Sequence, residues 1–119
     1  MIIYQGDDSS AFGQKITFRL RPGSDYAGCP AIVSYGEKKT LAGDITIATQ
    51  QVMVEEDNTF SLTISESETH LLALGVHPVR IKVFDKNGKG VTLQQEWQLN
   101  VEKAVCTGTV IDNIGIVVQ

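Results

Sequence analysis

One acidic stretch of the chain has the spacing of a calcium-binding loop. Asp85, Asn87, Gly90 and Glu96 stand at the first, third, sixth and twelfth positions of such a loop. The fifth position is Lys89, which offers calcium an ammonium group instead of an oxygen ligand. The residues after it alternate as in a strand, whereas a calcium loop of this kind leads into a helix. We therefore interpret the stretch as a turn and predict no metal there.

The chain's histidines and cysteines also have spacings that do not favour a metal site. His70 and His77 are seven residues apart, and neither Cys29 nor Cys106 is near them in the sequence. Zinc needs three or four ligands, and the chain has neither CxxC nor HxxxH spacing. We expect His77 to be a partly buried structural residue opposite Trp97, and the two cysteines to be unbridged thiols.

No other motif predicts an enzyme. The acidic clusters Asp7-Asp8 and Glu55 to Asn58 are typical of solvated turns. The serines lack a GxSxG elbow, and Gly88-Lys89-Gly90 lacks the spacing of a phosphate-binding loop. We predict no catalytic residue, no cofactor and no bound metal.

Bulk properties limit the partners. The 119 residues match the size of one domain, and the net charge of −4 makes nucleic acid an improbable ligand. The start of the chain has no basic region and no long apolar run, so we expect neither a signal peptide nor a membrane span. The chain is expected to fold in a cytoplasm.

The elements that must position these side chains are mostly strands. Apolar and polar residues alternate from Val91 to Val101, which predicts one long hairpin arm that points Trp97 inward. A type I turn starting at Asp85, with Gly88 in the left-handed conformation, aligns the two apolar faces. The pairs expected from this turn are Val83 with Val91, Ile81 with Leu93, and Val79 with Gln95.

Further strands follow from the same alternation and from turn residues. A second hairpin is predicted around Glu56-Asp57-Asn58. The expected strands before the long hairpin are 1–4, 15–20, 31–35, a weak stretch within 40–49, 51–55 and 59–64.

A short helix is the exception to the β pattern. Ser65 and Glu68 have the spacing of a capping box, leucines at 71, 72 and 74 form an apolar stripe, and Gly75 is expected to end the helix. The fold class predicted is all-β: an immunoglobulin-like antiparallel β-sandwich of seven or eight strands, with one short linking helix near residues 65–74. The sandwich should span 1–103, and 104–119 should form a C-terminal extension or an extra strand.

The framework also resembles a known family. The stretches that carry the resemblance are Tyr4-Gln5-Gly6-Asp7-Asp8, the strand 16–20, the strand 59–65, the capped turn 68–75 and the hairpin 79–88. Together they resemble the immunoglobulin-like domain found at the start of bacteriophage baseplate upper proteins and related phage and prophage tail proteins. The resemblance covers roughly Tyr4 to Val101. It implies a non-enzymatic structural protein of the virion, acting through contacts with other tail or baseplate proteins or with copies of itself in a homo-oligomer.

The alternative is a carbohydrate-binding or host-adhesion module, which needs exposed aromatic side chains. Phe18, Phe60 and Trp97 lie on apolar strand faces and are expected in the core. The remaining candidates are Tyr4, Tyr26 and Tyr35, which come from separate segments of the chain.

The end of the chain supplies the candidate interface residues. Ile114, Ile116 and Val118 alternate in an apolar tail that the predicted sandwich does not use. The tail is expected either to add to the sheet edge of a neighbouring copy or partner, or to fold back as one more strand on its own sheet.

Overall fold

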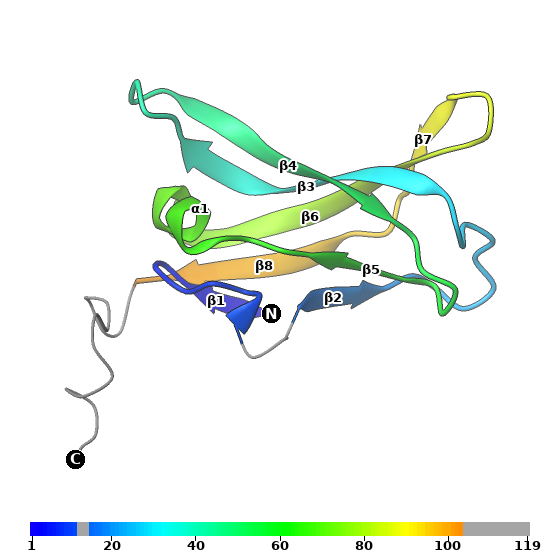
Figure 1. Cartoon of the computed structure of the whole chain (residues 1–119), viewed down its shortest axis with the longest axis horizontal. Helices are drawn as coiled ribbons and strands as arrows, with labels where there is room; N and C mark the ends of the chain where they lie inside the picture. Colours follow the sequence, from blue (N-terminus) through cyan, green and yellow to red (C-terminus); the bar gives the residue numbers. More distant parts are fainter. Residues whose placement is uncertain (12–14, 104–119) are drawn as a thin grey trace, which may run out of the picture.

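The computed structural model describes residues 1–11 and 15–103 (Figure 1). These residues form eight strands and one helix, which confirms the predicted mostly β composition. In chain order the elements are β1 (Ile2–Tyr4), β2 (Ile16–Arg19), β3 (Pro30–Lys39), β4 (Ile45–Met53), β5 (Thr59–Leu62), α1 (Glu66–Leu71), β6 (Gly75–Phe84), β7 (Gly90–Thr92) and β8 (Trp97–Glu102).

The strands form two facing sheets. The larger has the order β1-β8-β6-β3-β4, with β7 paired to the far end of β6, and the smaller contains β2 and β5. Figure 1 shows the small sheet lying along one side of the large one. This arrangement is the predicted immunoglobulin-like sandwich. One pairing departs from the antiparallel prediction, because β1 runs parallel to β8.

The core lies between the two sheets. Val79, Ile81 and Leu99 from the large sheet and Phe60 and Leu62 from the small sheet are all completely buried. Alternate residues along each strand face this core, as the period of two predicts. The burial of these apolar side chains away from water stabilises the packing of one sheet against the other.

The hairpin between β6 and β7 begins as predicted. The Gly88 amide donates to the Asp85 carbonyl, Gly88 has a φ of 78°, and Val83 pairs with Val91. Val91 is nevertheless exposed, because the hairpin projects beyond the small sheet that would cover it (Figure 1).

The register of the same hairpin changes farther from the turn. Val79 pairs with Trp97 instead of Gln95, and His77 lies opposite Leu99 instead of Trp97. The second arm is therefore two strands, β7 and β8, and not one. The cause is Gln95: its side chain accepts from the Arg21 amide at 3.0 Å and donates to the Arg19 carbonyl at 3.2 Å. These bonds take Gln95 out of the ladder and tie it to the small sheet.

The predicted hairpin around residues 56–58 is wrong. The tight turn exists, since the Glu55 amide donates to the Thr59 carbonyl, but β4 and β5 then enter different sheets. β4 pairs instead with β3, which is twice as long as predicted. β3 passes through Gly36 as a bulge at a φ of 143°, where the His77 ring occupies the space a side chain would need.

The helix α1 begins as predicted and ends earlier. The Ser65 side chain accepts from the Glu68 amide at 3.3 Å, which caps the first turn. The cap at the other end is Leu72, in an extended conformation, and Gly75 instead starts β6 with a φ of 119°. Leu72 is buried and fixes the helix to the end of β3, whereas Leu74 is exposed.

Among the described residues no helix is both long enough and apolar enough to cross a membrane. The proposed extension 104–119 lies outside the described residues.

Candidate protein-interaction surface

β4 is the outer strand of the large sheet, and its sequence is unusual for an edge. The strand Ile45-Thr46-Ile47-Ala48-Thr49-Gln50-Gln51-Val52-Met53 has no charged residue, no proline and no glycine. Among residues 1–11 and 15–103, its only strand partner is β3. Natural sheet edges are commonly protected by charges, prolines or short length. β4 has none of these protections.

Hydrogen bonds at both ends of β4 show which backbone groups are free. The Val54 amide donates to the Cys29 carbonyl, and the Thr40 amide donates to the Asp44 carbonyl. In an antiparallel ladder every second residue bonds to the neighbouring strand. The even residues of β4 therefore bond to β3, and the odd residues, from Ile45 to Met53, direct their amides and carbonyls to the open edge.

The side chains of the same odd residues lie on the outer face of the sheet, away from the small sheet. Ile45 is 65% exposed, Ile47 63% and Met53 52%. Ile32 of β3, paired with Gln51, is exposed on the same face. We call this region, Ile32 with the odd residues of β4, the β4 surface. It combines free backbone groups with exposed apolar side chains.

The inner side of β4 is held in place. Ala48 is completely buried. The Gln50 side chain donates to the Thr63 carbonyl at 2.7 Å and accepts from the Thr63 amide at 2.9 Å, which ties β4 to the end of β5. The edge is therefore presented by a strand fixed to both sheets, so that little ordering remains to be done on binding.

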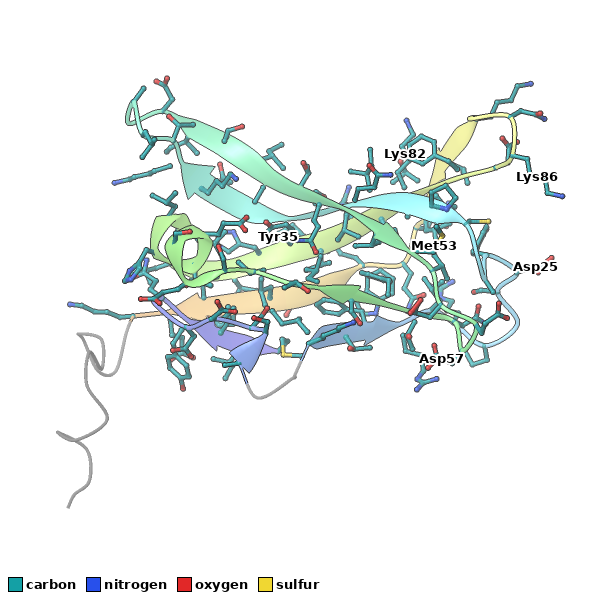
Figure 2. All side chains as sticks on the ribbon, viewed as in Figure 1. Asp25, Tyr35, Met53, Asp57, Lys82 and Lys86 are labelled. Atoms are coloured by element: carbon teal, nitrogen blue, oxygen red, sulfur yellow. The ribbon has the colours of Figure 1, made fainter. Side chains whose placement is uncertain are left out.

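The calcium-like stretch is a turn, as predicted. One oxygen of Asp85 accepts from the amides of Asn87 and Lys89, both at 2.9 Å. Glu96, at the twelfth position of the stretch, forms an ion pair with Arg80 of β6 at 2.7 Å. Lys82 and Lys86 are on the same projecting hairpin (Figure 2).

Two further acidic side chains are likewise engaged in local turns. Asp8 accepts from the hydroxyl and amide of Ser10, which lowers the pKa of its carboxyl. Asp57 accepts from the Thr59 hydroxyl at 2.6 Å, which lowers its pKa too. Within residues 1–11 and 15–103, no three His, Cys, Asp or Glu side chains are grouped as metal ligands would be.

The two histidines have different surroundings. His77 is buried, packs against Gly36, and has its Nε2 atom 2.8 Å from the Ala73 carbonyl oxygen. It is therefore a structural residue, as predicted, although opposite a different neighbour. His70 is exposed on α1, beside Gly6.

Within the part of the chain that the structure describes, the aromatic residues do not form an exposed platform. Phe18 and Phe60 are buried as predicted, and Trp97, predicted to be largely buried, is half-buried at the edge of the core. Tyr35 points into the interior (Figure 2), where its hydroxyl donates to Glu68 at 3.2 Å. Burial raises its pKa, and the Glu68 charge adds to the effect. Tyr26 packs on the core, and Tyr4 is half-buried on β1. The three candidate tyrosines therefore do not meet in one exposed sugar-stacking surface.

The sequence-based interface residues Ile114, Ile116 and Val118 lie outside the described residues, as does Cys106. Their pairing stays a prediction. Sequence reasoning misses the β4 surface because it divides the strand between a weak stretch within 40–49 and the incorrect hairpin around residues 56–58. The signal that could have found it was the uncharged run from Ile45 to Met53.

Comparison with known proteins finds no family model that matches the chain and no curated protein with a significant match to it.

Proposed function

We propose that this chain is a non-enzymatic structural domain that acts through protein–protein contacts, as a component of a phage or prophage tail or baseplate. The observation that carries the proposal is the β4 surface: an uncharged nine-residue strand at an open sheet edge. An extended segment that adds to such an edge gains main-chain hydrogen bonds, and its alternate side chains supply specificity.

Four of the carboxylates support a structural role. Asp8, Asp57 and Asp85 accept hydrogen bonds within their own turns, and Glu96 is paired with Arg80. Each of these carboxylates stabilises a loop or a strand end. The proposal of a phage tail in particular is based on the sequence resemblance described above.

The test is to look for the chain in assembled particles. Particles are purified from the source bacterium after prophage induction, or from a phage lysate, and the tail fraction is analysed by mass spectrometry. We expect the chain to be present in a fixed ratio to the other tail proteins. Its absence from tails that are otherwise complete would refute the assignment.

A pair of variants tests whether the β4 surface carries the contact. Thr49→Lys places a charge at the centre of the open edge, and Gln98→Lys places the same charge on the exposed outer face of β8. We expect Thr49→Lys to reduce incorporation into particles and Gln98→Lys to leave it unchanged. Equal incorporation of both would remove β4 from the contact.

A further inference from the structure

The geometry points to a second copy of this chain as the occupant of the β4 edge: we propose that β4 pairs antiparallel with β4 of the partner copy about a two-fold axis at Thr49. The inference rests on the proposed function, since it names the partner of the same surface. The result is one continuous sheet that runs through both copies. Such an isologous contact closes on itself and gives a dimer.

The register follows from the free backbone groups. Only odd residues of β4 present amides and carbonyls at the edge, so odd residues of the two copies must face each other. An axis at Thr49, the midpoint of the strand, places Thr49 opposite Thr49 of the partner copy and uses all nine residues. Ile47 then faces Gln51 of the partner copy, and Ile45 faces Met53 of the partner copy. An axis moved to Gln51 would place Ile45 opposite the partner's Asp57.

Charge favours the antiparallel direction. β4 itself is uncharged, so two copies approach without repulsion along its length. Beside its first residue lie Lys38 and Lys39, together with Glu37 and Asp44, whereas Glu55, Glu56 and Asp57 follow its last residue. An antiparallel pair brings the first end of β4, where these four charges balance, next to the acidic end of the other copy. A parallel pair would place the two acidic ends side by side.

The other open edge of the large sheet is a poorer candidate. β1 has three residues, and its partner β8 already binds it in parallel. β4 is three times as long and shows its apolar side chains, Ile45 and Met53, where the pairing would cover them. The contact is a strand edge and not a broad face, so we expect a dimer that forms reversibly as concentration rises.

The first experiment compares association at increasing concentrations by sedimentation velocity, using the full chain. We expect the wild type to pass from monomer to dimer, and Gln98→Lys to do the same. Thr49→Lys and Thr49→Glu each oppose like charges at the axis, so each alone should stay monomeric. Mixing the two variants should restore a dimer, which a variant that had merely misfolded could not do.

The second experiment tests the register by cross-linking in a background with Cys29→Ser and Cys106→Ser. Thr49→Cys places the two thiol-bearing Cα atoms about 5.5 Å apart in the proposed register, within reach of a short bismaleimide. Ile45→Cys is the control, because its two copies would lie eight residues apart along the strands, about 27 Å. Efficient cross-linking of the first alone supports the register, and equal cross-linking of both overturns it.

The outcomes separate this inference from the proposed function. A wild type that is monomeric at every concentration, or a dimer that survives Thr49→Lys, overturns β4 pairing. If such a monomer is still found in tail particles, the proposed function stands. If the dimer forms as described but the chain is absent from particles, the β4 pairing stands and the phage role fails.

Discussion

Replacing Phe60 by alanine should test whether an aromatic cluster joins the two sheets. Phe60 of β5 is completely buried, its ring centroid lies 5.4 Å from that of Phe18, and it meets the half-buried Trp97 ring edge-on at 5.0 Å. Phe18 and Phe60 belong to the small sheet and Trp97 to the large one. The cluster therefore crosses the interface between the sheets.

The expected loss of stability follows from the burial of the Phe60 ring and from the cavity that its removal leaves. Phe60→Ala removes a ring from a closed interior, so we expect a loss of about 3 to 5 kcal/mol in the free energy of unfolding. Trp97→Ala should cost less, about 2 to 3 kcal/mol, because part of its ring already contacts water and the space it leaves opens to solvent. The loss expected for Trp97→Ala includes roughly 1 kcal/mol for the hydrogen bond that the Trp97 ring donates to the Arg19 carbonyl at 3.2 Å.

The assay is urea unfolding followed by circular dichroism, with linear extrapolation to water. Phe60→Leu is the control, since it keeps most of the volume and should cost far less. The double variant Phe60→Ala with Trp97→Ala should show a coupling energy of about 0.5 to 1.5 kcal/mol between the Phe60 and Trp97 rings. A loss below about 1 kcal/mol for Phe60→Ala, or a larger loss for Trp97→Ala than for Phe60→Ala, would refute this account of the core.

Three further predictions concern single side chains. Tyr35→Phe should flatten the fall in the free energy of unfolding above pH 10. Burial raises the folded pKa of Tyr35, so the stability that its neutral hydroxyl contributes is complete below the unfolded pKa and is lost as pH rises through the folded pKa. An unchanged slope of stability against pH in urea titrations would contradict this. Gly36→Ala should cost about 1 to 3 kcal/mol, because the backbone has a φ of 143° and the new Cβ would lie 3.1 Å from the His77 ring, and a thermal midpoint equal to that of wild type would exclude it. Ser65→Ala should cost about 1 kcal/mol through loss of the cap of α1, with Ser65→Asp as the variant that retains stability in thermal melts.

The fold class could be predicted because most of it depends on local patterns. Alternation along β2, β6 and β8 and the turn at Asp85 are read from neighbouring residues, and each appears in the structure. The register beyond β7 could not be read in this way. It depends on Gln95 reaching the backbone of Arg19 and Arg21, more than seventy residues earlier in the chain. Local alternation carries no information about such a contact.

The candidate surface was harder to predict than the fold. Ile45 and Ile47 are apolar, and an apolar residue in a strand is ordinarily assigned to the core. That they face outward depends on the position of β4 at the edge, beyond the cover of the small sheet, which is a property of the assembled sheets. The strand order, in turn, depends on pairings between distant segments.

The parallel pairing of β1 with β8 also determines how the domain bears a mechanical load. Ile2 lies beside Asn100 and Tyr4 beside Glu102, and the pair is extended by bonds from the Asn100 amide to the Met1 carbonyl and from the Gln5 amide to the Glu102 carbonyl. Because the strands run in the same direction, a force that pulls Met1 and Lys103 apart slides one strand along the other. The bonds between them are then strained together in shear and do not open one at a time. Resistance to pulling therefore depends on this short ladder, whatever the equilibrium stability of the core behind it.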